Sequence, residues 1–168
     1  MERRLPPGSR AHAGGFTYLA VLLAVALLGV ALAAVGTVWS TEARRDREAQ
    51  LLFAGEAYRA AIASYYRQGP IVGQLPGDLH ELLEDTRTLQ PTRHLRRLYP
   101  DPMTGNADWQ LIRAADAGIV GVYSSSGKAP LKRANFPANE APFADADCYC
   151  AWRFEFTPAR WRRAPPKP

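Results

Sequence analysis

Apolar and polar residues are distributed very unevenly along this chain of 168 residues, and its first long segment is apolar throughout. From Phe16 to Trp39 no side chain is charged. A helix needs about 20 apolar residues to cross the hydrocarbon core of a bilayer, and helices of soluble proteins are rarely apolar on every side. The pattern therefore predicts a membrane-spanning helix over residues 16–41.

The pattern changes at Glu42, where charged residues begin to alternate with apolar ones at helical spacing. No proline occurs from Gly8 to Gln68, so nothing interrupts the backbone hydrogen bonds of a helix. We therefore expect one helix from Phe16 to Gln68. Its second half carries an apolar stripe that requires a partner surface. The stripe consists of Leu51, Ala54, Tyr58, Ala61, Ile62 and Tyr65.

Turn residues dominate the next part of the chain. Residues 69–78 are rich in glycine and proline and predict a loop. Asp78 is placed to cap a short helix over residues 79–84, with Glu81 three positions later. Residues 98–106 end in Gly105-Asn106 and predict a tight reversal.

Three later segments have the alternation of strands. Residues 108–114 and 119–124 flank a turn signal at 116–118 and are expected to pair as a hairpin. Residues 149–156 alternate well and form the third candidate, while residues 125–147 read as a long connection without periodicity. The predicted fold class is α+β, with the long helix packed on a small three-stranded antiparallel sheet.

The positive charge lies mostly at the two ends of the chain. The formal net charge is +5, but the first ten and last eleven residues hold seven of the 21 basic residues and only one of the 16 acidic residues. The body is near neutral and has no basic stripe with interleaved aromatics, so we expect no nucleic-acid partner.

Chemistry-bearing residues are few. His12, His80 and His94 lack the spacing of metal ligands, and no nucleophile elbow or phosphate-binding glycine loop occurs, so we expect no enzyme. The two cysteines, Cys148 and Cys150, are separated by one residue. In a strand their Cα atoms would lie near the upper limit of about 7 Å for a disulfide, so a disulfide and two buried thiols both remain open.

The residues before the apolar segment predict how the chain is processed. Three arginines, Arg3, Arg4 and Arg10, precede the pair Gly14-Gly15. A secretory signal places its small-residue cleavage site after the apolar region, whereas here the small residues come first. The basic leader predicts a cytoplasmic N-terminus.

This junction, continued by Phe16-Thr17-Tyr18-Leu19, resembles the type IV pilin-like family, the class III signal-peptide proteins. The resemblance implies that a prepilin peptidase cleaves between Gly15 and Phe16 and methylates the new N-terminus at Phe16. Most members have glutamate at the fifth mature position, where this chain has Ala20. That departure favours a minor or atypical subunit.

Later segments resemble the major group of type II secretion pseudopilins. Residues 99–106 are similar to its D-P-x-G-N turn, residues 123–128 to its serine-glycine segment, and Asp145-Ala146-Asp147 to the D-A-D motif before the last strand. The resemblance implies a pilin-like fold and a pseudopilus subunit. It also implies Ca²⁺ as a possible cofactor, with Asp145 and Asp147 as ligands.

The predicted domain organisation follows from these features. Residues 1–15 are a cleaved leader, 16–41 the membrane half of the helix, 42–157 a periplasmic α+β domain, and 158–168 a basic, proline-rich tail that we expect to be mobile. The protein would lie in a bacterial inner membrane and form a periplasmic fibre. Expected partners are the prepilin peptidase, other pseudopilin subunits, the inner-membrane assembly platform and the lipid bilayer.

Other interpretations remain open. The apolar segment is also compatible with an uncleaved signal anchor, a secretory signal cut near residues 31–33, or a soluble core helix. At the level of function, the alternatives are a minor pilin of a type IV pilus and a membrane-anchored periplasmic binding domain that never polymerises.

Overall fold

The computed structural model describes residues 14–71, 73–115 and 118–158, and for residues 14–15 and 33–38 the backbone alone. The predicted leader and tail therefore lie almost entirely outside the described residues. The chain divides into two compact units, one ending at Ala43 and one beginning at Arg44. Each unit is described by itself below.

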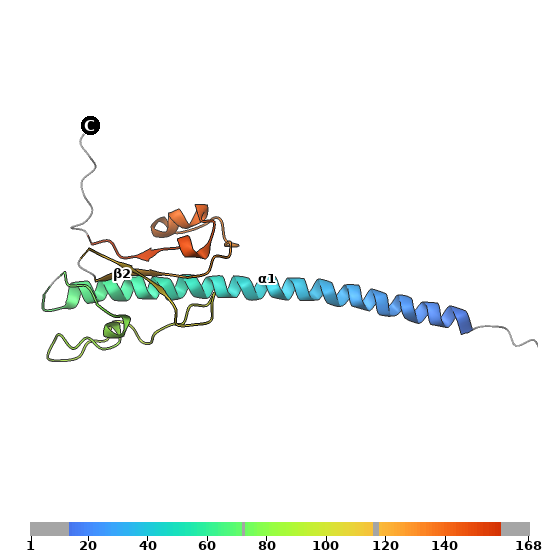
Figure 1. Ribbon diagram of the computed structural model, residues 1–168, viewed down its shortest axis with the longest axis horizontal. Helices are drawn as coiled ribbons and strands as arrows, with labels where there is room; N and C mark the ends of the chain where they lie inside the picture. The colour runs from blue at the N-terminus through green and yellow to red at the C-terminus, as the bar shows by residue number, and fades with distance from the viewer. Residues whose placement is uncertain (1–13, 72, 116–117, 159–168) are drawn as a thin grey trace, which may run out of the picture. The chain divides into compact units, whose positions relative to one another are not determined.

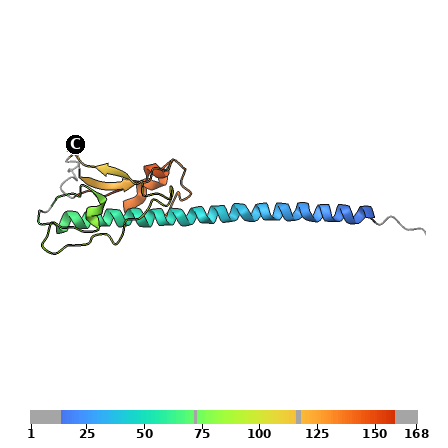
Figure 2. The same cartoon turned by 60° about the horizontal axis from the view of Figure 1, so that its bottom comes forward.

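The helix predicted from the sequence is confirmed as α1, which spans Gly14–Gln68 (Figures 1 and 2). From residue 44 onward it is amphipathic, and its apolar side packs on the rest of the unit. All six residues of the predicted stripe belong to the core, and none is more than 2 % exposed. The stripe is buried because its members recur on one side of the helix, while charged residues occupy the other.

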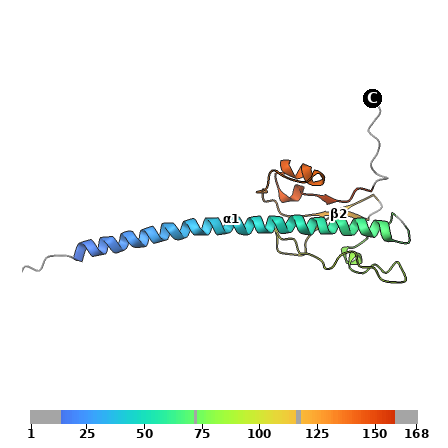
Figure 3. The same ribbon diagram turned by 180° about the vertical axis from the view of Figure 1, so that it is seen from behind.

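The predicted antiparallel sheet is also confirmed. It consists of β1 (Gln110–Arg113), β2 (Ile119–Tyr123) and β3 (Phe154–Glu155) in the order β1-β2-β3. β1 and β2 form the expected hairpin, with a register irregularity between Ile112 and Arg113. β2 is central, and it lies beside the second part of α1 (Figure 3).

Helix and sheet pack closely at Gly55. A Cβ atom at this position would lie 2.3 Å from the ring of Phe154, which is fully buried in β3. Such a distance is well inside van der Waals contact, so the packing of α1 on β3 depends on a residue without a side chain.

The third strand was predicted too long. Residues 149–156 contain a 3-10 helix, η3 (Tyr149–Ala151), and only Phe154–Glu155 pair with β2. Tyr149, Trp152 and Phe154 are all fully buried. Tyr149 is buried in the turn, and Phe154 is buried in the short strand. The apolar residues of this segment therefore indicated burial, and not one continuous strand.

The sequence predicted a long connection without periodicity over residues 125–147. The structure shows that part of it is regular. It contains η2 (Ala138–Asp145), a 3-10 helix that buries Phe143. The rings of Phe143 and Trp152 stack with centroids 5.4 Å apart, and Phe136 contacts both edge-on. These aromatic contacts join η2 to the residue directly after η3 and make the connection part of the core.

The segment after α1 is compact despite its few regular elements. The predicted short helix is η1 (Leu79–Leu82), and the carboxylate of Asp78 accepts a hydrogen bond from the backbone N–H of His80 at 2.7 Å. The predicted reversal is present at Gly105, whose φ of 81° favours glycine. It is closed by the backbone N–H of Asp101, which donates to the carbonyl of Asn106 at 2.7 Å.

Candidate functional site

The first unit exposes apolar side chains on every side of α1. All residues from 16 to 32 are exposed, among them Phe16 (81 %) and Leu32 (70 %). Monomeric soluble proteins rarely expose contiguous apolar patches larger than a few hundred Å². An exposed apolar surface of this extent is typical of an interaction site.

None of the helices in the described part of the chain combines the length and the apolar character that crossing a membrane requires.

The predicted cleavage site lies at the start of the same helix. Gly14 and Gly15 are the first residues of α1, and the exposed Phe16 follows directly. The first turn contains no acidic residue, and Ala20 is exposed one turn further on. The predicted cut between Gly15 and Phe16 therefore falls in the first turn of α1, and this processing stays a prediction.

The second unit contains an anchor that the sequence did not suggest. Glu48 of α1 is 5 % exposed, and its carboxylate accepts hydrogen bonds from the backbone N–H groups of Leu131 and Lys132, each at 3.0 Å. One turn earlier, Arg44 donates to the carbonyl of Ala129. Hydrogen bonds to a charged acceptor contribute about 1.5 to 3 kcal/mol each, so Glu48 holds the start of the long connection on the helix.

A second buried network joins the reversal to the end of β2. Asp101 is fully buried, and its carboxylate accepts from the Ser124 hydroxyl at 2.6 Å and from the Met103 backbone N–H at 2.8 Å. The Ser124 hydroxyl in turn accepts from the backbone N–H of Ser126 at 3.1 Å. The Asp101 carboxylate and the Ser124 hydroxyl therefore both have partners, and the network fixes the loop after β2.

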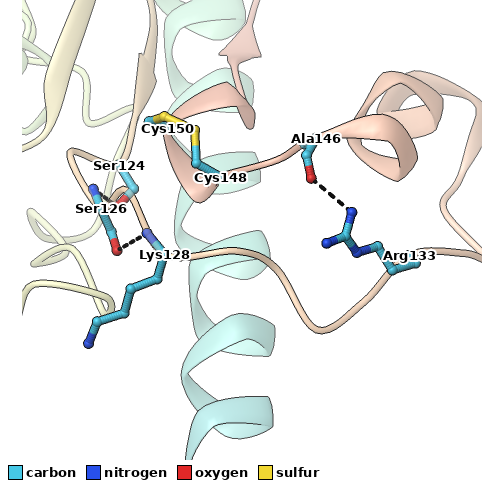
Figure 4. The surroundings of a disulfide bond; sticks show 7 residues. All are labelled: Ser124, Ser126, Lys128, Arg133, Ala146, Cys148 and Cys150. Atoms are coloured by element: carbon cyan, nitrogen blue, oxygen red, sulfur yellow. Dashed lines mark hydrogen bonds between the residues drawn. A yellow bond between two sulfur atoms is a disulfide. The ribbon is translucent and has the colours of Figure 1, made fainter.

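The two cysteines are joined in a disulfide beside this loop (Figure 4). Their Cα atoms are 5.1 Å apart, shorter than an extended strand would give, because η3 begins between them. The backbone N–H of Cys150 donates to the carbonyl of Ser126 at 3.1 Å. The turn therefore resolves the choice left open by the sequence, and the disulfide closes the end of the long connection.

The predicted calcium ligands lie on the surface just before the disulfide. Asp145 ends η2, Asp147 follows two residues later, and both are exposed. The intervening carbonyl of Ala146 accepts a hydrogen bond from the guanidinium of Arg133 at 3.3 Å (Figure 4). Among the residues with described side chains, no group of three or more acidic, histidine or cysteine side chains is arranged to hold a metal ion. Calcium binding at these aspartates is implied by the family resemblance alone.

A buried cluster near the end of α1 contains the residue types of acid–base chemistry. The Arg87 guanidinium donates to both carboxylate oxygens of Asp85, at 2.8 and 2.6 Å, and these hydrogen bonds hold the pKa of Asp85 far below its usual value. His94 lies 3.2 Å from Asp85 through Nε2 and 2.9 Å from the Ser64 hydroxyl through Nδ1.

This order of acid, imidazole and hydroxyl resembles a catalytic relay, but the imidazole of His94 is not accessible to a substrate. The side chain of His94 is fully buried, and its ring packs edge-on against Tyr65 with centroids 5.5 Å apart. No substrate could reach the imidazole without unfolding of the cluster. The arrangement instead joins residues 85–94 to the last turns of α1.

A shallow cavity of about 350 Å³ opens beside α1 in the second unit. Its apolar walls are Phe53, Tyr99, Pro100 and Pro102, and the guanidinium of Arg97 lies 5.2 Å from the centre of the Tyr99 ring. Phe53 is 64 % exposed and meets Tyr99 edge-on. Exposed aromatic rings beside a cation are typical of protein-binding surfaces.

The sequence carried weak signals for the residues that were missed. Glu48 lies three positions before Leu51, in line with the apolar stripe, where a charged side chain requires a buried partner. Asp101 stands between two prolines in a turn, where an aspartate commonly bonds the backbone two residues on. Neither signal identifies the distant partners, Leu131 and Ser124, because those contacts form only in the folded unit.

No protein-family model, no curated protein and no solved structure matches this chain. The resemblance in its motifs therefore stays a prediction, and its function must be inferred from its own residues.

Proposed function

We propose that this chain is a structural subunit, of minor or atypical type, of a type II secretion pseudopilus. The observation that carries the proposal is the exposed apolar surface of α1 over residues 16–32. This surface continues a helix whose second part is packed in a folded unit. A chain built in this way has one part for folding and another for association.

The bilayer is the first partner in the proposed mechanism. The sequence from Phe16 to Trp39 has no charge, and the arginines of the leader keep the N-terminus cytoplasmic. Trp39 is 75 % exposed near the end of the segment, where an indole favours the membrane interface. The segment would span the inner membrane and leave residues from 44 onward in the periplasm.

Other subunits are the second partner. After the peptidase cuts between Gly15 and Phe16, the apolar helices of several copies pack together in the core of a fibre. Small residues permit close packing of helices, and the exposed part of α1 contains Ala24, Ala26, Gly29 and Ala31. At Gly29 a Cβ atom would meet nothing within 4 Å, so the helix offers open space to a neighbour.

Ala20 accounts for the proposed minor role. In a fibre core an N-terminal ammonium that has no carboxylate nearby costs several kcal/mol. Ala20 supplies no carboxylate, so a fibre made only of this chain would carry that cost in every subunit. The chain is better suited to a position where the cost occurs once, such as a tip.

Assembly tests this proposal. The full chain is produced with the peptidase, the assembly platform and a major pseudopilin, and sheared fibres are examined for it by immunogold electron microscopy. We expect the chain at low copy number in fibres and no long fibres from the chain alone. Val25→Arg should abolish its recovery in fibres, whereas Val25→Leu should not. Absence of the wild-type chain from fibres would support a non-polymerising anchored domain, and long homopolymers would contradict the minor role.

A further inference from the structure

The disulfide at η3 encloses a single residue. Cys148 and Cys150 are two positions apart, and Tyr149 lies between them. A disulfide stabilises a fold mainly by restricting the unfolded chain, and this restriction grows with the length of the loop that the bond closes. A bridge over one residue restricts the unfolded chain least, so we expect the second unit to stay folded without it.

The turn that carries the cysteines is held by contacts that do not involve sulfur. The backbone N–H of Tyr149 donates to the carbonyl of Lys128 at 3.0 Å. The backbone N–H of Cys150 donates to the carbonyl of Ser126 at 3.1 Å. The rings of Tyr149 and of Trp152, directly after η3, are fully buried. Breaking the disulfide leaves these contacts in place, and they keep the two thiols close enough to bond again.

The disulfide lies at the surface of the second unit. Both cysteines are partly exposed, and the residues on either side of them, Asp147 and Ala151, are exposed. Figure 4 shows the two sulfur atoms on the turn, beside the loop that contains Ser126. Exposed disulfides are more readily reduced than buried structural ones. A thiolate of another molecule can therefore reach a sulfur atom without unfolding of the unit.

The chain offers no other thiol to this disulfide. It contains two cysteines in all, and both belong to the bond. Reduction therefore cannot lead to a different pairing within the chain, and the thiol that breaks the bond must come from another molecule. The two sulfur atoms form a site at which electrons enter and leave while the rest of the turn keeps its contacts.

We propose that Cys148 and Cys150 form a thiol–disulfide exchange site, which accepts two electrons from a dithiol while the second unit stays folded. One thiolate of the dithiol attacks a sulfur atom of the disulfide, and the bond between Cys148 and Cys150 breaks. The cysteine that leaves takes up a proton, and the second thiolate of the dithiol then displaces the other cysteine from the mixed disulfide.

The products are two cysteine thiols in this chain and one disulfide in the partner. The two protons that the dithiol loses are balanced by the two that the cysteines gain, and this chain is the oxidant. The reverse reaction, with a disulfide as oxidant, restores the bond. This activity goes beyond the proposed function and does not depend on assembly into a fibre.

Reduction of the folded, full-length chain in detergent tests the proposal. The chain is treated with dithiothreitol and then with oxidised glutathione. Samples are quenched with acid and alkylated, free thiols are counted by mass spectrometry, and tryptophan fluorescence reports whether the chain stays folded. The chain unfolded in guanidinium gives the rate for an unprotected disulfide. The double variant Cys148→Ser, Cys150→Ser is the control for alkylation and for folding without the bond.

The disulfide of the folded chain should be reduced at a rate within about tenfold of that in the unfolded chain, since its sulfur atoms are accessible. The fluorescence of the folded state should be the same before and after reduction, and the same in the double variant. Oxidised glutathione should restore the bond in the folded chain.

A bond that opens only as fast as the chain unfolds would overturn the proposal, because the disulfide would then be protected by the fold. Loss of the folded fluorescence on reduction would also overturn it, and so would failure of the bond to form again. These outcomes are separate from those of the fibre experiment. A chain that exchanges its disulfide but never enters fibres would contradict the proposed function alone.

Discussion

The two parts of α1 have the same backbone structure but opposite relations to their surroundings. Over residues 16–32 every side chain is exposed and most are apolar, whereas from residue 44 onward one stripe is buried and the remaining positions are mainly polar or small. Both parts satisfy their backbone hydrogen bonds within the helix. The difference shows that side-chain pattern, and not helix formation, decides whether a segment completes its own fold or awaits a partner.

The largest effect is expected from truncation in the packed part. Tyr58 is 1 % exposed, its hydroxyl donates to the carbonyl of Tyr99 at 3.0 Å and accepts from its N–H at 2.9 Å, and its ring meets Trp109. Tyr58→Ala should lower the free energy of unfolding by about 4 kcal/mol. Leu28→Ala, in the exposed part, should change it by less than about 0.5 kcal/mol. Denaturant unfolding of the full chain in detergent measures the free energy of unfolding of both variants. An equal loss in the two variants would contradict the proposed difference between the two parts of α1.

Acid should weaken the packed part through Asp85. Its pKa lies below the unfolded value of about 3.9 because of the Arg87 guanidinium. The stabilisation is therefore complete above that unfolded value and is lost as the pH falls below it. Asp85→Asn should cost about 3 kcal/mol at pH 7, since it breaks a buried ion pair.

The difference between the wild type and Asp85→Asn should shrink between about pH 5 and pH 2. Melting curves across this range measure it, with Glu84→Gln at an exposed position as the control. A difference that stays constant with pH would show that the charge of Asp85 contributes nothing.

A smaller effect is expected at the anchor of the long connection. Glu48→Gln should cost about 2 kcal/mol, because the neutral amide is a weaker acceptor for the N–H groups of Leu131 and Lys132. Those two amides should exchange their hydrogens faster than in the wild type. Asp46→Asn, two residues earlier and exposed, should leave their exchange unchanged. Equal exchange in both variants would show that Glu48 does not hold the loop.

The smallest effect is expected from calcium. Asp145 and Asp147 are exposed, and the carbonyl between them already accepts from Arg133. We expect a chelator to shift the melting temperature of the full chain by less than about 1 °C, which corresponds to a few tenths of a kcal/mol. A large shift that calcium alone restores would show that these aspartates are ligands, as the family resemblance implies.

Local patterns predicted the regular parts of the fold. The helix, its buried stripe and the hairpin of β1 and β2 follow from spacing and turn residues that lie close together in the sequence. The third strand was overestimated because Tyr149, Trp152 and Phe154 are buried in a turn and a short strand together. The Cα separation of the cysteines was misjudged for the same reason.

Contacts between distant residues could not be predicted. The anchor joins positions 83 and 84 apart in sequence, and the bond from Ser124 to Asp101 spans 23 positions. The cavity beside Phe53 exists only because residues 97–105 fold against α1. Such contacts depend on where the packed elements meet, which no local period encodes. The predicted cleavage site rests on adjacent residues at the start of α1 and not on distant contacts, and it stays a prediction.

The most direct test of the account is the N-terminus of the native protein. The full chain, isolated from membranes in which the prepilin peptidase is active, is analysed by intact-mass and N-terminal peptide mass spectrometry. We predict a chain that begins at N-methylated Phe16 and retains the apolar part of α1. A chain that still begins at Met1, or one from which the apolar segment has been removed, would contradict the central claim.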